Sequence, residues 1–334
     1  MTPEEVLASA RVFALPLKRE FRGVTVREGL LFEGPSGWAE FAPFHDHGDA
    51  HAGRWLAAAL EQAYGSWPEP VRASVPINAI IPTTDAATTR TLVEEALASG
   101  CTTIKTKVGS ERFEEDVERV AAIRGALDDA GVDGAIRIDT NQGWSLEQAI
   151  DRIGVLDAIA GGLEYAEQPV ADRDDLIALR RALDVRIAVD EGIRLAADPR
   201  GAVRSLREVA DVAVLKAIPL GGVRTALALA SAIDLPIVVS GSLDTAVGLA
   251  GGLQLAACLP ELGGACGLGT GALLARDVVT EQAPIIEGAL PVRRVVPDGI
   301  DEVAGDDAML ARWEERLRRA WPHARSPFSS EGPR

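Results

Sequence analysis

The sequence predicts an α/β protein, a modified TIM barrel of the (β/α)7β type with an α+β capping domain built from the N-terminus and the C-terminal tail. From residue 74 onward, short β-branched runs alternate regularly with helical periods. The first 73 residues have strand and hairpin patterns instead. The alternation ends without an eighth helix, and an amphipathic segment follows. Because alternating strands and helices form parallel sheets with helical crossovers, eight such strands indicate a closed barrel.

The N-terminal segment is predicted to form a small α+β unit. "SARVFALPL" and "VTVREGLLFEG" have the pattern of strands, and the turn "GPSG" leads into "WAEFAPF". Glycine and proline between two apolar runs indicate a hairpin. Residues 50–66 have a helical period. We therefore expect residues 1–73 to form the capping domain.

The barrel is predicted over residues 74–284. Its strands are expected at "SVPINAII", "TTIKTKVG", "AIRIDTNQGW", "LEYAEQPV", "RIAVDEGIR", "VAVLKAIPLGG", "LPIVVSG" and "ACGLGTGALL". A helical period follows each of the first seven, and no regular helix follows the eighth. Residues 285–334 contain the amphipathic "DDAMLARWEERLRRAW", which we expect to pack back on the capping domain.

Composition narrows the class of protein. The 334 residues are 47% apolar, which is enough for a large core. The net charge of −16 argues against nucleic acid as a partner, since phosphate binding needs basic patches. No signal pattern and no membrane-spanning apolar run are recognised, and the odd number of cysteines without a CxxC pair fits free thiols. We expect a soluble cytoplasmic protein with a small-molecule partner, and no pattern predicts its oligomeric state.

Ionisable residues stand near the carboxyl ends of the second to sixth predicted barrel strands. Interiors of parallel strands are normally apolar, and barrel active sites form at this end. A single acid there is commonly a helix N-cap, and several can form structural ion pairs. Carboxylates on three consecutive strands, flanked by lysines, would instead converge on one point. The residues are Lys105, Lys107, Arg137, Asp139, Glu167, Asp190, Glu191 and Lys216.

Three converging carboxylates need a cation among them. Oxygen-only ligation suits a hard divalent ion, so we expect Mg²⁺, with Mn²⁺ as a substitute. A second candidate is the run "HDHGDAH" in the capping domain, which fits either a transition-metal site or a solvated loop. Its histidines are His45, His47 and His51.

Lys107 is a candidate base. A free lysine has a pKa of ~10.4, and a neighbouring ammonium or divalent cation favours its neutral form. Lys105 lies two residues earlier, on the same face of the strand, and is expected to lower the pKa of Lys107. Lys216 would face Lys107 across the barrel. This arrangement suits removal of a proton α to a carboxylate, with a metal stabilising the enediolate.

These motifs resemble those of the enolase superfamily, in its muconate-lactonizing-type subgroup. "WAEFAPF" is similar to the family's cap strand, with Ala39 where glycine is usual, and "IKTKVG" to its K-x-K strand. "RIDTNQGW", "EQP" and "VDEG" resemble its three metal-ligand strands, and "LKAIPLGG" its strand with the opposing lysine. The resemblance covers nearly the whole chain. It implies metal ligands Asp139, Glu167 and Asp190, an acid/base pair Lys107 and Lys216, and supporting residues Lys105, Asn141 and Glu191.

Within the subgroup, the sequence resembles dehydratases that form o-succinylbenzoate in menaquinone biosynthesis, from a cyclohexadiene carboxylate bearing a hydroxyl and a succinyl group. The compact N-terminal unit and Arg137, two residues before Asp139 as in an R-x-D motif, favour this reaction. A buried ion pair is the alternative for Arg137. In "VSGSLDTAVG", Ser240, Gly241 and Ser242 are expected to donate hydrogen bonds to a substrate carboxylate, or else to cap the next helix. An N-acylamino acid racemase (also as a second activity), a cycloisomerase and a non-catalytic metal-stabilised barrel are the alternative functions.

Overall fold

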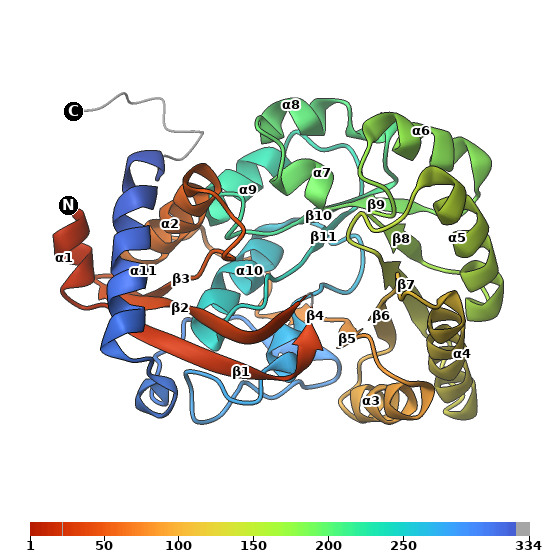
Figure 1. Ribbon diagram of the computed structural model, residues 1–334, viewed down its shortest axis with the longest axis horizontal. Coiled ribbons are helices and arrows are strands. Elements are labelled where there is room, and N and C mark those ends of the chain that lie inside the picture. Colours follow the sequence, from red (N-terminus) through yellow and green to blue (C-terminus); the bar gives the residue numbers. More distant parts are fainter. Residues whose placement is uncertain (22, 325–334) are drawn as a thin grey trace.

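The computed structural model describes residues 1–21 and 23–324, in which an antiparallel sheet lies at one end and a parallel sheet at the other (Figure 1). The antiparallel sheet has the order β1-β2-β3. It is made of β1 (Arg11–Phe21), β2 (Val24–Gly34) and β3 (Gly37–Phe41), with the short helix α1 (Pro3–Leu7) before it. As the sequence predicts, β2 and β3 form a hairpin, in which Gly34 pairs with Gly37.

Two helices distant in the sequence complete the capping part. They are α2 (Asp49–Tyr64) and α11 (Asp307–Ala320), and they pack on each other and on the antiparallel sheet. The ring of Trp313 in α11 meets that of Phe41 in β3 edge to face, with centroids 6.1 Å apart, and Trp55 of α2 joins the same core. The amphipathic tail therefore packs against the N-terminal unit.

The parallel sheet has seven strands in the order β11-β10-β9-β8-β7-β6-β5. They are β5 (Ala79–Ile81), β6 (Thr103–Lys107), β7 (Ala135–Asp139), β8 (Tyr165–Glu167), β9 (Ile187–Val189), β10 (Val212–Leu215) and β11 (Ile237–Val239). The predicted eighth strand is reduced to two parallel bridges, Gly267 with Ser240 and Cys266 with Ile77, which connect the two edges of the sheet. The 3-10 helix η2 (Gly269–Leu273) follows directly. The fold prediction is therefore confirmed.

Helices cover the outer face of the parallel sheet (Figure 1). They are α3 (Ala86–Ala98), α4 (Phe113–Asp129), α5 (Leu146–Ala160), α6 (Arg173–Ala182), α8 (Pro199–Arg204), α9 (Val223–Ala230) and α10 (Ala246–Cys258), with the 3-10 helix η1 (Leu206–Glu208) between α8 and α9. At five of their N-termini, the side chain of the capping residue accepts backbone hydrogen bonds; these residues are Asp85, Ser145, Asp172, Asp198 and Thr245. Such caps satisfy N–H groups that have no partner within the helix.

Short elements join the two parts. The strand β4 (Ser74–Pro76) pairs antiparallel with β12 (Ala289–Pro291), and the 3-10 helices η3 (Ile300–Val303) and η4 (Trp321–His323) flank α11.

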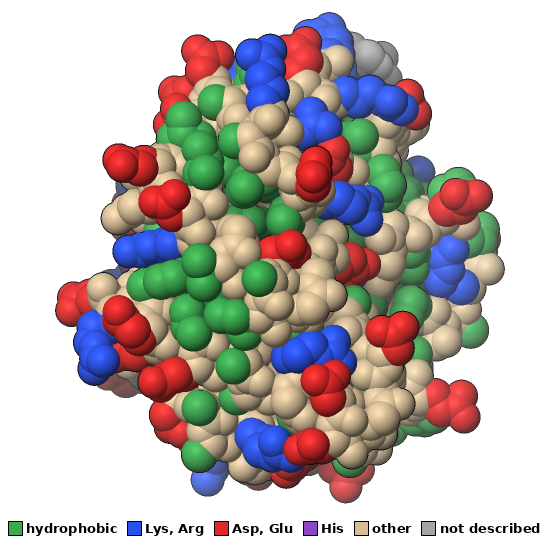
Figure 2. Space-filling view, turned by 90° about the vertical axis from the view of Figure 1, so that its right-hand side faces the viewer, with side chains coloured by type: hydrophobic (Ala, Val, Ile, Leu, Met, Phe, Trp, Pro, Cys, Tyr) green, Lys and Arg blue, Asp and Glu red, His purple; other side chains and the backbone are tan. Residues whose placement is uncertain are grey.

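The division of the chain into domains at 1–73, 74–284 and 285–334 stays a prediction, and the last ten residues of the third segment lie outside the described part of the chain. No described helix is long and apolar enough to span a membrane. Acidic and basic side chains are interspersed over the face shown in Figure 2.

The interior of the barrel has an apolar layer below a polar one. Tyr165, Ala188, Val212, Val214 and Val238 form a buried cluster of inward-facing residues. Side chains two residues apart on a strand point the same way, so Glu167 lies above Tyr165, Asp190 above Ala188 and Lys216 above Val214. The alternation of the strands therefore places the ionisable residues at the carboxyl end of the barrel.

Candidate active site

Three carboxylates form a row across neighbouring strands. Asp139 ends β7 and pairs in register with Glu167, which ends β8, and Asp190 follows β9. All three side chains are at most 2% exposed. The parallel sheet therefore brings together the three predicted metal ligands, and their charge must be balanced inside the protein.

Lysines from the strands on either side supply this balance. The Lys105 Nζ lies 2.8 Å from Asp139 Oδ2 and 2.6 Å from Glu167 Oε2. The Lys107 Nζ lies 2.7 Å from the same Asp139 oxygen, and the Lys216 Nζ lies 2.8 Å from Asp190 Oδ2. The two lysines of β6 therefore point into the barrel and share one carboxylate oxygen, and Lys216 meets the other end of the row.

Asn141 and Glu191 connect the two ends of the row. Lys107 donates to Asn141 Oδ1 at 2.5 Å, and Asn141 Nδ2 donates to Glu191 Oε1 at 3.0 Å. Asn141 has a left-handed backbone with φ of +50°, a conformation that asparagine adopts more readily than most residues. Both predicted supporting residues thus contact the cluster.

Arg194 belongs to the site, although the sequence analysis did not identify it. The chain turns after Asp190 into the short helix α7 (Glu191–Arg194), where the sequence predicts a continuing strand. Arg194 Nε donates to Asp190 Oδ1 at 3.0 Å, and Nη2 donates to Glu191 Oε1 at 2.6 Å. Its position four residues after Asp190 is the helical spacing of an ion pair, which is the signal that could have identified it.

Gln168 is a second residue that sequence reasoning missed. It is the middle residue of the quoted "EQP", and it is fully buried with a left-handed φ of +40°. Its Oε1 accepts hydrogen bonds from the backbone N–H groups of Asp190 and Gly192, at 3.2 and 3.0 Å. Gln168 therefore fixes the backbone that carries Asp190.

The carboxylates of the row are electrostatically different. Burial favours the neutral acid at Asp139, but Lys105 and Lys107 outweigh it and hold the pKa of Asp139 well below its usual range. At Glu167, burial dominates over the attraction of Lys105, and the pKa is raised to about 7. The pKa of Lys105 lies above its usual value because Asp139 and Glu167 outweigh its burial. The middle of the row therefore has the smallest share of positive charge.

The donor set fits a hard divalent cation. Glu167 Oε1 is buried and has no hydrogen-bond partner among the described residues, and the three candidate ligands supply only carboxylate oxygens. Among the described residues, no three His, Cys, Asp or Glu side chains are already arranged as a metal site, and lysine ammonium groups contact the three candidate ligands. This also applies to "HDHGDAH", where the rings of His47 and His51 lie 5.9 Å apart and His47 packs against Trp55.

Arg137 does not contact the row. Its side chain is fully buried one layer below, with Nε 2.6 Å from Glu164 Oε2 and the guanidinium 4.7 Å from the centre of the Tyr165 ring. Nη1 donates to Asn78 Oδ1 at 2.9 Å. The structure thus places Arg137 in the buried ion pair that was its alternative.

The predicted anion-binding residues follow β11. Ser240 and Ser242 are buried, and Gly241 between them is half-buried. Leu215 of β10 pairs in register with Val239 of β11, so Lys216 and Ser240 occupy equivalent positions on neighbouring strands. These residues therefore lie at the carboxyl end of the barrel, beside Lys216.

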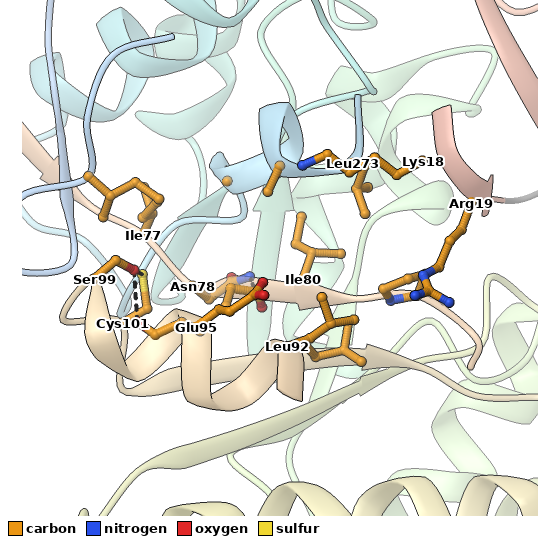
Figure 3. Close-up of a pocket in the computed structure, with 17 residues that line it drawn as sticks. Lys18, Arg19, Ile77, Asn78, Ile80, Leu92, Glu95, Ser99, Cys101 and Leu273 are labelled. Atoms are coloured by element: carbon orange, nitrogen blue, oxygen red, sulfur yellow. Dashed lines mark hydrogen bonds between the residues drawn. The ribbon is translucent and has the colours of Figure 1, made fainter. Parts of the chain in front are cut away.

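Phe21, at the end of β1, reaches the site from the capping part. Its ring centre lies 5.3 Å from the Lys107 Nζ. Next to it is a cavity of about 540 Å³, between α3, β5 and η2 (Figure 3). Lys18, Arg19 and Ile80 line this cavity, but among the described residues none of the row's carboxylates or flanking lysines does. The cavity is therefore separate from the candidate catalytic groups.

Comparisons with known proteins agree with this geometry. The enolase N-terminal domain-like family matches residues 12–63, and the enolase C-terminal domain-like family matches residues 88–299. Among solved structures, the L-Ala-D/L-Glu epimerase of Bacillus subtilis has a TM-score of 0.72 at 21% identity, covering 85% of this chain and 95% of that one. Muconate cycloisomerase from Pseudomonas fluorescens has a TM-score of 0.72 at 18% identity, covering 89% and 98%. At these identities, the two structures support the fold alone.

Relatives of higher sequence identity indicate the family within this superfamily. The o-succinylbenzoate synthase of Thermobifida fusca is 47% identical over 320 residues, which are 94% of this chain and 97% of that protein. The o-succinylbenzoate synthase of Mycobacterium leprae is 46% identical over 326 residues, 96% of this chain and 93% of that protein. The chain therefore belongs to the enolase superfamily and, within it, to the o-succinylbenzoate synthase family.

Proposed function

We propose that the protein is a Mg²⁺-dependent dehydratase that converts 2-succinyl-6-hydroxy-2,4-cyclohexadiene-1-carboxylate to o-succinylbenzoate and water, a step of menaquinone biosynthesis. The observation that carries the proposal is the buried row of carboxylates with a lysine at each end. The identity of about 47% to an o-succinylbenzoate synthase supports the choice of substrate. The three cysteines are free thiols, which supports a cytoplasmic location.

In the proposed mechanism, Lys107 takes the proton α to the ring carboxylate. Its contact with Asn141 Oδ1 holds the amine in place. The same lysine then gives this proton to the leaving hydroxyl, which departs as water in a syn elimination. The C–H and C–O bonds break, a ring double bond forms, and the ring becomes aromatic. Lys216 stays protonated and stabilises the anion from the other side.

The metal is proposed to bind at Asp139, Glu167 and Asp190. When bound, Mg²⁺ supplies the positive charge that stabilises an enediolate. With Lys107 neutral as the base, the four acids of the cluster face three cations, Lys105, Lys216 and Arg194. A divalent cation would then leave one positive charge, which the ring carboxylate of the substrate would neutralise.

The experiment that tests the proposal follows the loss of the hydroxycyclohexadiene chromophore with Mg²⁺ and after chelation. We expect turnover only with the metal. Lys107→Ala should abolish turnover with an unchanged circular dichroism spectrum, whereas Lys18→Ala, in the neighbouring cavity, is the matched control that should stay active. Turnover that persists without a divalent metal, or in Lys107→Ala, contradicts the mechanism.

A further inference from the structure

The loop between β11 and α10, residues 240–245, is held by charged side chains that the mechanism does not use. Arg27 of β2 donates from Nε to the carbonyl of Leu243 at 3.1 Å. Glu40 of β3 accepts from the backbone N–H of Thr245 at 2.8 Å. Asp244, inside the loop, accepts from the N–H of Ser242 at 2.8 Å. Two strands of the capping part thus reach the loop that carries the candidate anion-binding residues.

The loop has a conformation that needs such support. Leu243 has a φ of +60°, a left-handed backbone that costs a residue with a Cβ about 1 kcal/mol or more. Its side chain is buried in a small apolar cluster with Phe21 and Leu273, beside the Lys107 amine. Such strain persists where the surroundings fix it. The bond from Arg27 to the Leu243 carbonyl is one of these constraints.

Glu40 and Asp244 are an unusual pair at this junction. They are 1% and 4% exposed, and neither Glu40 Oε1 nor Asp244 Oδ1 has a hydrogen-bond partner among the described residues. The nearest cation to Glu40, Arg27, lies 3.9 Å away. Burial and the neighbouring Asp244 raise the pKa of Glu40 to about 8, and burial raises the pKa of Asp244 as well. Burying carboxyl oxygens without hydrogen-bond partners costs free energy, which indicates that the pair has a specific role at this junction.

We propose that Arg27, Glu40 and Asp244 are positioning residues, which set the conformation of loop 240–245 so that Ser240, Gly241 and Ser242 can bind a substrate carboxylate. This inference rests on the proposed function. It assigns to the capping part a direct role in the affinity for substrate. The alternative is that these residues only dock the capping part on the barrel.

Glu61 provides a matched control for docking. Like Glu40, it projects from the capping part and accepts hydrogen bonds from barrel N–H groups, those of Val223 and Arg224 at 2.5 and 2.9 Å. These groups begin α9, away from loop 240–245. Its substitution therefore removes a contact of the same kind at a different place.

The test measures kcat, KM and the free energy of unfolding for Glu40→Ala, Glu40→Gln and Glu61→Ala. We expect Glu40→Ala to raise KM about tenfold while kcat changes less than about threefold, because ground-state binding is lost. Glu40→Gln should keep KM within about twofold, since an uncharged amide oxygen still accepts from Thr245. Glu61→Ala should lower the unfolding free energy and leave KM unchanged. Arg27→Lys keeps the charge but removes the Nε–H that donates to the Leu243 carbonyl, so it should raise KM as well. It replaces Glu40→Ala in the test if that variant does not fold.

The outcomes separate the two levels of inference. Equal rises of KM in Glu40→Ala and Glu61→Ala, or an unchanged KM in Glu40→Ala and Arg27→Lys, overturn the positioning role. A wild-type protein without Mg²⁺-dependent dehydration refutes the proposed function instead. In that case, calorimetry of o-succinylbenzoate binding tests the positioning role on its own. Equal affinity in Glu40→Ala and the wild type would overturn the positioning role too.

Discussion

Replacing Arg194 with methionine tests whether the candidate site is held by balanced charge. Arg194 is 5% exposed and donates to Asp190 and Glu191 at 3.0 and 2.6 Å. Burial favours neutral Asp190, but Arg194 and Lys216 outweigh it and hold its pKa below the usual range. Breaking a buried ion pair by removing one partner costs about 3–5 kcal/mol, and because Lys216 remains beside Asp190 we expect about 3 kcal/mol.

Urea unfolding of the metal-free protein, analysed by linear extrapolation, measures this loss. Arg173→Met is the matched control, because Arg173 pairs with Glu208 where the two side chains are 44% and 63% exposed. A pair at the surface is worth less than about 1 kcal/mol. Saturating Mg²⁺ should recover part of the loss in Arg194→Met, since Asp190 is a proposed ligand. If both variants lose the same free energy within about 0.5 kcal/mol, the balanced-charge argument is wrong.

Three further predictions concern the metal, the junction and the capping strand. Mg²⁺ should raise the Tm of the wild type but not of Glu167→Gln, measured by thermal scans with and without chelator; an equal shift in both excludes Glu167 as a ligand. Because the pKa of Glu40 is raised from 4.5 to about 8, its stabilising contribution is fully present below pH 4.5 and is lost as the pH rises from there through about 8. The unfolding free energies at pH 4.5 and 8 should therefore differ less for Glu40→Gln than for the wild type, and an identical pH dependence would falsify the assignment. Phe21→Ala should lower kcat/KM about three- to tenfold without unfolding the protein, since it removes a ring 5.3 Å from the Lys107 amine; unchanged kinetics would count against this contact.

The barrel could be predicted because its strands and helices have different periods of apolar residues. What could not be predicted depends on contacts between distant segments. The sequence predicts an eighth strand at "ACGLGTGALL", but the structure has only single bridges there, from Cys266 to Ile77 and from Gly267 to Ser240. The run after Val189 has the composition of a strand, but Asp190 and Glu191 meet Arg194 only when α7 forms.

In the candidate site, too, residues recognisable from strand patterns could be predicted, and residues that depend on contacts between distant segments could not. The lysines and carboxylates were identified because they interrupt apolar strands at the end where barrels carry out their chemistry. For Arg137, the spacing from Asp139 fixes the face of the strand but not the height that a long side chain reaches, and Arg137 extends to Glu164. Phe21 and Glu40 come from the capping part, and nothing in the sequence relates them to a particular barrel strand.

These observations indicate which part of the molecule determines the specificity for substrate. The epimerase and the cycloisomerase share this fold at about 20% identity, so the barrel alone does not determine the substrate. In the proposed mechanism, the carboxylates hold charge and the lysines move protons, which many substrates with an acidic α-proton require. Specificity must then come from groups that meet the rest of the substrate. In this chain, the capping part contacts the site through Phe21 and through loop 240–245, held by Arg27 and Glu40. We therefore expect changes of specificity to follow substitutions at this junction rather than in the row of carboxylates.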